Sequence, residues 1–293
     1  ACNPPNRKLV TRYEKTNLKK FSEKLKTSIA SNNSLVCVGL DPVKSRLPES
    51  IREKSDSIIA FNREIINNTS DLVCAYKPNF AFYGALGIPG WEALIATVEY
   101  VPSGIPVIVD AKVGDIGSTA EQYATMLFEE IGAAATTVNP YMGKDSVEPF
   151  LEYSNKGTFL LCLTSNPGAD DIEKRQLLEG HRVYEELASK AVQWDQSGNC
   201  GIVVGATQVE AMRSIRMLAP DLPILIPGVG AQGGDVKATV TSATRRDGSG
   251  ILVNASRSVI YASSGDDFGV AARTATEKLR DEINEYRTHN CPV

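Results

Sequence analysis

Residues 107–119 read Val-Ile-Val-Asp-Ala-Lys-Val-Gly-Asp-Ile-Gly-Ser-Thr and carry the clearest local pattern in the chain. The apolar start is typical of a buried strand, which delivers Asp110 and Lys112 before Gly114 interrupts it. Side chains alternate between the two faces of a strand, so Asp110 and Lys112 are expected to point the same way. Asp115 follows the glycine, where a loop can direct it back toward the lysine or away to a neighbouring subunit.

These charges admit two interpretations. Two carboxylates around one ammonium favour the charged form of the lysine, and a charged, oriented lysine can deliver a proton to a carbanion. Charged residues at the end of a buried strand are also common as structural ion pairs. Ionisable groups with perturbed pKa values therefore do not always mark a catalytic site. The stretch alone leaves both interpretations open.

Short apolar runs recur on both sides of this stretch, with amphipathic segments between them. Continuous apolar runs are typical of parallel strands that are covered on both faces. Eight such runs that alternate with helices over about 250 residues predict an α/β fold, a single (β/α)8 barrel (TIM barrel). The strands are expected near residues 35–40, 72–76, 106–110, 134–138, 158–163, 201–206, 223–227 and 250–254.

The ends of the barrel domain follow from weaker patterns. Apolar residues from Leu18 to Ile29 recur at spacings of three and four, which predicts a helix ahead of the first strand. Residues 1–16 are expected to form a loose N-terminal arm, and residues 17–293 the barrel domain with this leading helix. The connection from about 165 to 200 is long enough to hold a mobile loop as well as a helix.

Composition excludes several classes of protein. The 293 residues are 42% hydrophobic and 23% charged, which is ordinary for a soluble globular protein. A net charge of −4 argues against a nucleic-acid-binding surface, and no stretch is apolar for long enough to span a membrane. The six cysteines form no CxxC pair and no secretory signal is visible, so the cytoplasm is expected. His181 and His289 have no partner at metal-ligand spacing, and no metal site is expected.

Polar residues follow nearly every predicted strand. Barrel enzymes place their chemistry at the C-terminal ends of the strands, so these residues are the candidates for a site. After the seventh run, a glycine-rich loop at 228–234 allows backbone N–H groups to approach an anion. Arg257, after the eighth run, has a guanidinium group that can bind phosphate through two parallel hydrogen bonds. The two together predict a phosphate site.

Seven short elements now stand in order at the strand ends. They are Gly-Leu-Asp-Pro (39–42), Tyr-Lys-Pro-Asn-Phe-Ala-Phe-Tyr (76–83), Asp-Ala-Lys-Val-Gly-Asp-Ile-Gly-Ser-Thr (110–119), Asn-Pro-Tyr-Met-Gly (139–143), Thr-Ser-Asn-Pro-Gly (164–168), Pro-Gly-Val-Gly-Ala-Gln-Gly-Gly (227–234) and Arg-Ser-Val-Ile-Tyr (257–261). With them, the chain from about Leu35 to Ser263 resembles orotidine 5′-phosphate decarboxylase in its longer, largely bacterial form. The resemblance implies conversion of orotidine 5′-monophosphate to uridine 5′-monophosphate and CO2 in pyrimidine synthesis. It implies no metal or organic cofactor, and a homodimer with shared active sites.

The resemblance also implies roles for individual residues. Asp110 would crowd the carboxylate of the substrate, and Lys112 would protonate C6 as CO2 leaves. Lys77 would bond into this charged network and, with Asp41, hold the ribose hydroxyls. Asp115 and Thr119 would come from the partner subunit. Four further residues would bind the rest of the substrate: Ser165 the pyrimidine amide edge, Gln232 both base and phosphate, and Gly233 and Arg257 the phosphate.

Two alternatives remain beside this interpretation. A metal-dependent decarboxylase of a keto-sugar phosphate shares the Asp-x-Lys-x-x-Asp spacing, but it would need an acidic ligand near Lys77, whose charge repels a divalent cation. A nucleotide-binding barrel without catalytic activity would not need the set of charged residues. One departure from the family pattern is Val113, where the longer form usually has arginine; this affects the tuning of the charges rather than the reaction.

Overall fold

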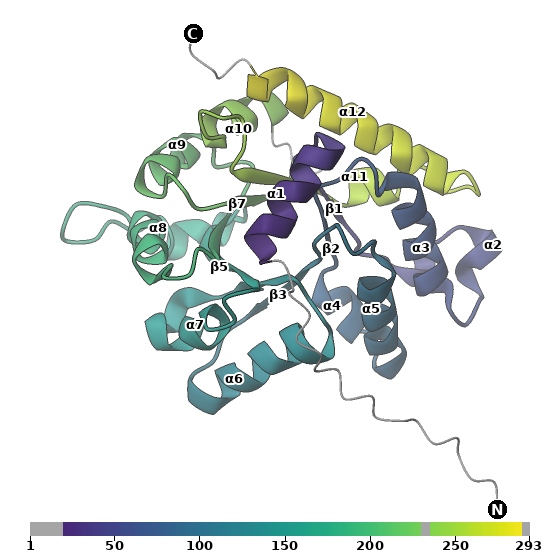
Figure 1. Ribbon diagram of the computed structural model, residues 1–293, viewed down its shortest axis with the longest axis horizontal. Helices are drawn as coiled ribbons and strands as arrows, with labels where there is room; N and C mark the ends of the chain where they lie inside the picture. The colour runs from purple at the N-terminus through teal and green to yellow at the C-terminus, as the bar shows by residue number, and fades with distance from the viewer. Residues whose placement is uncertain (1–19, 230–234, 289–293) are drawn as a thin grey trace, which may run out of the picture.

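A ring of parallel strands surrounded by helices makes up the protein in a computed structural model that describes residues 20–229 and 235–288 (Figure 1). The strands form at the continuous apolar runs because both of their faces are buried, one by the barrel interior and one by helices. They are β1 (Val36–Gly39), β2 (Ala75–Lys77), β3 (Ile108–Val113), β4 (Ala135–Val138), β5 (Gly157–Leu163), β6 (Cys200–Val204), β7 (Ile224–Pro227) and β8 (Ile251–Ala255). The predicted (β/α)8 barrel is confirmed.

The strand order closes the ring. Hydrogen-bonded neighbours follow the order β2-β1-β8-β7-β6-β5-β4-β3, and each pair is parallel. β2 and β3 are joined by two isolated parallel bridges, from Tyr76 to Val107 and from Asn79 to Asp110. Because the strands are parallel, the polar residues that follow them gather at one end of the barrel.

Helices connect the strands and cover the outside of the ring (Figure 1). They are α1 (Phe21–Asn32), α2 (Glu49–Arg52), α3 (Ser57–Thr69), α4 (Phe80–Gly84), α5 (Ile88–Tyr100), α6 (Gly117–Thr125), α7 (Lys144–Leu151), α8 (Val183–Trp194), α9 (Val209–Leu218), α10 (Val236–Ala243), α11 (Arg257–Ile260) and α12 (Phe268–Thr288), with short helical turns η1 (Lys44–Arg46), η2 (Met126–Glu130), η3 (Pro140–Met142) and η4 (Pro167–Asp171). The last helix, α12, packs against α3, α10 and β1. Among the described residues, no helix is both long and apolar enough to cross a membrane.

The predicted leading helix is α1, which crosses the N-terminal end of the barrel (Figure 1). Its first residue, Phe21, donates a backbone hydrogen bond to the carbonyl of Asn155, just before β5 begins. The Phe21 ring also meets the edge of Phe159 inside β5, with 5.8 Å between ring centroids. The proposed arm at 1–16 lies outside the described residues.

The barrel interior is a separate apolar cluster to which every strand contributes. Among the helices of the described residues, α1 alone adds side chains to it, so this helix seals the end of the barrel opposite the polar rim. The buried members of the cluster are Phe21, Leu25, Cys37, Cys74, Ala75, Ile108, Ala135, Phe159, Val203, Leu225 and Leu252.

The long connection after β5 holds both a loop and a helix, as its length predicts. The turn η4 comes first, and an antiparallel bridge between Gln176 and Arg182 then closes a narrow protruding loop. Leu178, at the tip of this loop, is fully exposed. Helix α8 completes the connection.

Gly157 permits the close approach of α1 to β5. A Cβ atom at this position would lie 2.5 Å from Cδ1 of Phe21. We therefore expect Gly157→Ala to lower the free energy of unfolding by about 1–3 kcal/mol, the usual cost of overpacking a core, in urea denaturation. Gly104→Ala is the matched control, because no atom lies within 4 Å of a Cβ there. Equal effects of the two substitutions would contradict the seal described here.

Candidate active site

A cavity of about 410 Å³ opens at the C-terminal end of the barrel. Its walls come from the ends of strands and from the loops that follow them. Six of the ten predicted site residues line it: Asp41, Lys77, Asp110, Lys112, Ser165 and Arg257. Gln232 and Gly233 lie outside the described residues.

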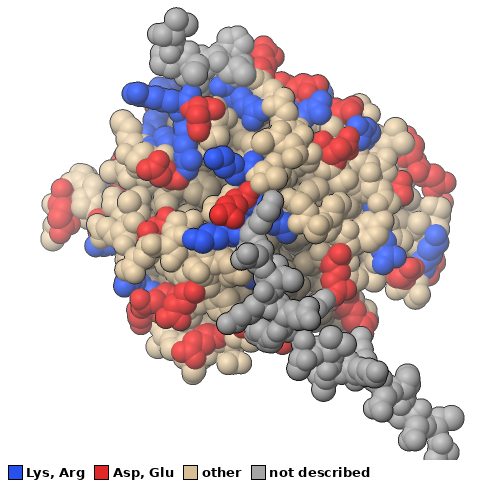
Figure 2. Space-filling model, viewed as in Figure 1, with Lys and Arg blue, Asp and Glu red and all other residues tan. Residues whose placement is uncertain are grey.

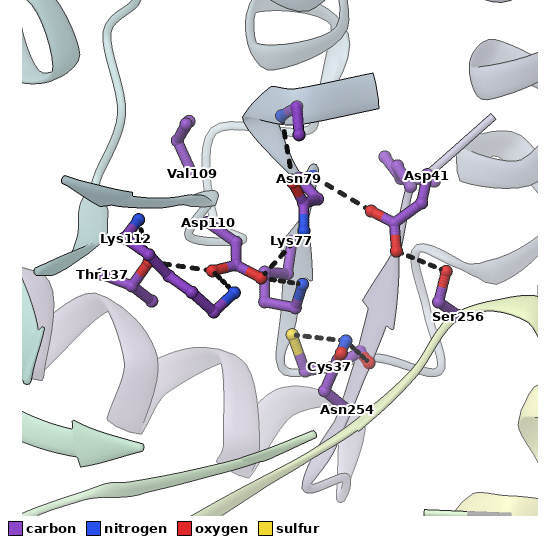
Figure 3. Close-up of polar contacts among 12 residues, drawn as sticks. Cys37, Asp41, Lys77, Asn79, Val109, Asp110, Lys112, Thr137, Asn254 and Ser256 are labelled. Carbon is purple, nitrogen blue, oxygen red and sulfur yellow. Dashed lines mark hydrogen bonds and ion pairs between the residues drawn. The ribbon is translucent and has the colours of Figure 1, made fainter. Parts of the chain in front are cut away.

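The Asp110 carboxylate is the centre of the polar network in this cavity (Figure 3). Its Oδ2 atom accepts hydrogen bonds from Nζ of Lys77 at 2.8 Å and from Nδ2 of Asn79 at 3.4 Å. Its Oδ1 atom accepts from Nζ of Lys112 at 2.5 Å and from Oγ1 of Thr137 at 2.8 Å. Side chains from β2, β3 and β4 and from the turn after β2 thus converge on one carboxylate.

Burial makes this pairing strong. Asp110 is 6% exposed, and burial by itself would raise the pKa of its carboxyl group. The ammonium groups of Lys77 and Lys112 outweigh that effect and hold the pKa well below its usual range. Burial would likewise lower the pKa of Lys77, but the Asp110 and Asp41 carboxylates raise it instead. Asp110 and Lys77 therefore both stay charged at neutral pH.

The two lysines have different access to the cavity. Lys77 is only 3% exposed, so its ammonium is held inside the network. The Lys112 side chain is 43% exposed, so its ammonium is in contact with the cavity. Of the two, Lys112 is the one positioned to exchange a proton with a bound molecule.

Lys112 reaches Asp110 in a different way from the expected strand alternation. Its φ angle is +49°, in the left-handed region that non-glycine residues seldom adopt. The pairing of β3 with β4 also shifts between Val109 and Val113. Asp110 and Lys112 do lie together, as predicted, but a local bulge rather than a regular strand brings them into contact.

Asp41 forms a second polar cluster at the wall of the cavity. Its Oδ1 accepts from the backbone N–H of Asn79 at 3.0 Å, and its Oδ2 accepts from Oγ of Ser256 at 2.7 Å. Gly39 allows this approach of β1 to the end of β8, since a Cβ there would lie 2.6 Å from Cβ of Ser256. The Asp41 carboxylate is consequently fixed in direction while it faces the cavity.

The predicted phosphate corner lies after β7 and β8. Arg257 is exposed, begins α11 and lines the cavity together with Gly228 and Val229. Gly228 has a φ angle of +93°, which a glycine adopts without strain. The Arg257 side chain and the backbone at Gly228 thus lie at the same edge of the cavity.

Asp115 and Thr119 do not line the cavity of their own chain. The Oδ1 atom of Asp115 accepts a hydrogen bond from the backbone N–H of Ile116 at 2.8 Å. Thr119 is exposed in the first turn of α6. Of the two directions open to Asp115 from the sequence, the structure favours the one away from Lys112.

Three residues of the network were not among the predicted site residues. Asn79 and Ser256 stand directly at strand ends, so their position was a usable signal. Thr137 lies inside the buried strand β4, where a threonine has no pattern that distinguishes it from a core residue. Within residues 20–229 and 235–288, no three His, Cys, Asp or Glu side chains are grouped as metal ligands would be.

Comparison with known proteins decides the family. The family described as orotidine 5′-phosphate decarboxylase / HUMPS matches residues 34–272 of the chain. The chain belongs to this family. The match covers all eight strands, and with them the barrel mouth, which is the cavity at their C-terminal ends.

Individual members of the orotidine 5′-phosphate decarboxylase / HUMPS family are close to the chain. An orotidine 5′-phosphate decarboxylase from Aromatoleum aromaticum is 48% identical over 91% of this chain and 99% of its own length. One from Roseiflexus castenholzii is 49% identical over 90% and 97%. The solved structure of Leishmania donovani OMP decarboxylase is 38% identical, covers 92% of this chain and 99% of its own, and superposes with a TM-score of 0.81.

The charge balance of the network is testable through stability. Asp110→Asn keeps the shape of the side chain but leaves the buried Lys77 ammonium without a carboxylate within hydrogen-bonding distance. We expect the free energy of unfolding at pH 7 to fall by about 3–5 kcal/mol in urea denaturation. The difference from wild type should narrow below about pH 4, because the pKa of Asp110 is lower in the folded than in the unfolded chain.

Asp71→Asn is the matched control for this measurement. Asp71 also pairs with a cation, Arg273 at 2.8 Å, but its side chain is 59% exposed. Exposed pairs contribute about 0–1 kcal/mol, so this variant should remain close to wild type. An Asp110→Asn protein as stable as Asp71→Asn would contradict the role given to burial.

Proposed function

We propose that this chain decarboxylates orotidine 5′-monophosphate to uridine 5′-monophosphate and CO2, the last step of pyrimidine nucleotide synthesis. The observation that carries the proposal is the Asp110 carboxylate, buried between Lys77 and Lys112 at the floor of the barrel mouth. Relatives of about 48% identity that are named orotidine 5′-phosphate decarboxylase support it.

The cavity supports one orientation of the nucleotide. Arg257 and the loop after β7, with Gln232 and Gly233, would bind the phosphate. Asp41 and Lys77 would hold the ribose hydroxyls, and Ser165 would bind the amide edge of the base. This orientation brings the carboxylate on C6 next to Asp110 and the ammonium of Lys112.

Decarboxylation then proceeds by a simple exchange at C6. The bond from C6 to the carboxylate carbon breaks, CO2 leaves, and the electron pair stays on C6 as a carbanion. The Lys112 ammonium stabilises this charge as it develops and transfers one proton to C6, because fixed charge at that point favours the transition state over the bound substrate. Solvent then returns a proton to the Lys112 amine.

Repulsion between Asp110 and the substrate carboxylate is a second contribution. Two carboxylates at close range raise the energy of the bound substrate, and departure of CO2 removes the repulsion. We assign the larger share to binding of the distant phosphate and to the ammonium of Lys112. The buried contacts of Asp110 act mainly to hold that ammonium in place.

We also propose a homodimer in which Asp115 and Thr119 complete the site of the partner subunit. Among the described residues, Asp110 is the carboxylate paired with the Lys112 ammonium, whereas Asp115 accepts a hydrogen bond from the backbone N–H of Ile116. Exposed apolar side chains occur in this region: Ile116, next to Asp115 in the chain, is 55% exposed, and Met142, 42% exposed, has its Cε atom 3.4 Å from the position of a Cβ at Gly114. Tyr141, next to Met142 in η3, is 78% exposed. Exposed apolar side chains that form a continuous patch mark surfaces where another chain binds, and such a patch here would support the proposed dimer.

The remaining expectations stay proposals of the same kind. We propose an arm of residues 1–16 ahead of a barrel domain of residues 17–293. A cytoplasmic location is supported by Cys37, Cys74, Cys162 and Cys200, which are free and buried. We propose a reaction without metal or organic cofactor, since the Lys77 ammonium occupies the place where a keto-sugar-phosphate decarboxylase would need an acidic metal ligand.

Turnover in the presence of EDTA tests the proposed function directly. The protein is expected to consume orotidine 5′-monophosphate, followed by ultraviolet absorbance, and Lys112→Ala should lower kcat by at least about 10³-fold because the proton donor is lost. Lys190→Ala, a change in a half-exposed lysine of α8, is the control and should remain active.

Each other result points elsewhere. Turnover that requires magnesium and a keto-sugar phosphate would favour the metal-dependent alternative. Tight nucleotide binding without turnover would favour a binding protein. Substantial activity of Lys112→Ala would remove the lysine from its proposed role.

Mixing two inactive variants tests the shared site. In a heterodimer of Lys112→Ala and Asp115→Asn chains, one of the two sites has both native residues. Random exchange should therefore restore about a quarter of the sites, and activity should approach about a quarter of wild type. Mixing Lys112→Ala with Asp110→Asn is the control. Asp110 and Lys112 belong to the site of the same chain, so neither site of this heterodimer has both native residues, and no recovery is expected. Absence of recovery in the first mixture, with exchange demonstrated by mass spectrometry, would contradict the contribution of Asp115 to the partner.

A further inference from the structure

The bulge in β3 lies opposite a single residue of β4. Val109 pairs with Thr136 and Val113 pairs with Val138, so the three residues from 110 to 112 face Thr137 alone. Bulges of this kind interrupt the regular ladder and redirect side chains, and they occur often beside active sites. Two of the three bulged residues are Asp110 and Lys112.

Thr137 supplies the hydrogen bonds that the interrupted ladder lacks (Figure 3). Its Oγ1 atom accepts from the backbone N–H of Lys112 at 2.9 Å. The same hydroxyl donates to Oδ1 of Asp110 at 2.8 Å. Because the hydroxyl has one proton and the Asp110 carboxylate is ionised, the direction of both bonds is fixed.

These bonds complete a closed ring around Lys112. Its backbone N–H donates to the Thr137 hydroxyl, and this hydroxyl donates to Oδ1 of Asp110. The same Oδ1 atom accepts from Nζ of Lys112 at 2.5 Å. Both ends of the lysine are thereby held by one hydroxyl and one carboxylate oxygen. The left-handed backbone conformation of Lys112 is strained, and surrounding contacts must offset this strain. The hydrogen bond from its N–H to the Thr137 hydroxyl is one of these contacts.

We propose that Thr137 is a positioning residue for Lys112, and that its hydroxyl sets the place of the ammonium in the cavity. This inference rests on the proposed function, in which that ammonium is the proton donor. Thr137 is fully buried and does not line the cavity, so it acts through Lys112 and Asp110 rather than on the substrate.

The neighbouring residue provides a matched comparison. Thr136 is also fully buried in β4, and its hydroxyl donates to the backbone carbonyl of Val109 at 2.8 Å. It bonds to the same strand, β3, but not to either charged residue. Removal of the Thr136 hydroxyl therefore measures the cost of a lost β3–β4 hydrogen bond without a change at the charges.

The experiment compares Thr137→Val, Thr137→Ser and Thr136→Val in steady-state kinetics with orotidine 5′-monophosphate. Thr137→Val should lower kcat by about 10- to 100-fold, the factor that corresponds to one hydrogen bond to a charged group, and change KM by less than about threefold. Thr137→Ser restores the hydroxyl and should return kcat to within about threefold of wild type. Thr136→Val should keep the wild-type kcat, whatever its loss of thermal stability.

Three results would overturn the proposal: an unchanged kcat in Thr137→Val, an equal loss in Thr136→Val, or no recovery in Thr137→Ser. If Thr137→Val does not fold, Thr137→Ala takes its place in the same comparison. Wild-type protein without turnover would contradict the proposed function instead. In that case the crystal structures of wild type and Thr137→Val test the positioning role of Thr137. An unchanged φ angle of Lys112 and an unchanged contact with Asp110 in the variant would contradict that role.

Discussion

Asp110 keeps a full negative charge in a place from which water is almost excluded. A buried carboxylate is stable only if donors surround it, and here the donors come from two lysines, an asparagine and a threonine on neighbouring elements. The geometry of the barrel mouth follows from this requirement. β2, β3 and β4 must meet at one height so that their side chains reach the same two oxygen atoms.

The two cations around this carboxylate have separate tasks. Lys77 is buried and neutralises the charge of Asp110, which keeps the network intact without a ligand. Lys112 shares the same carboxylate but faces the cavity, so its ammonium is oriented and still available for chemistry. The buried Lys77–Asp110 contact fits the interpretation as a structural ion pair, and Lys112 is the lysine to which the proposed role of proton donor is assigned.

The sequence alone predicted the barrel because its evidence is repeated eight times, and each apolar run supports the others. It also predicted six of the residues that line the cavity, since polar residues that follow parallel strands gather at that end of the barrel. The left-handed conformation of Lys112 and the bulge were beyond its reach, because they depend on how β3 and β4 fit together. For the same reason Thr137 resembled a core threonine: its partner is a backbone N–H that becomes free only in the folded barrel.

The direction of the Asp115 side chain could not be predicted from the sequence for a different reason. The proposed role of Asp115 depends on a second chain, and the sequence of one chain bears on such a contact only through exposed apolar residues such as Ile116. The loop with Gln232 and Gly233 lies outside the described residues, so its glycine pattern remains the basis for assigning it to phosphate.

The seal made by α1 closes the end of the barrel opposite the cavity. Phe21 and Leu25 close the interior from below, and an apolar layer fills the space between them and the charged floor. With the nucleotide bound as proposed, CO2 would leave through the same cavity that admits the substrate. In the proposed reaction, the carbanion at C6 can either recapture CO2 or take up a proton, and an ammonium held beside C6 in advance would favour the proton.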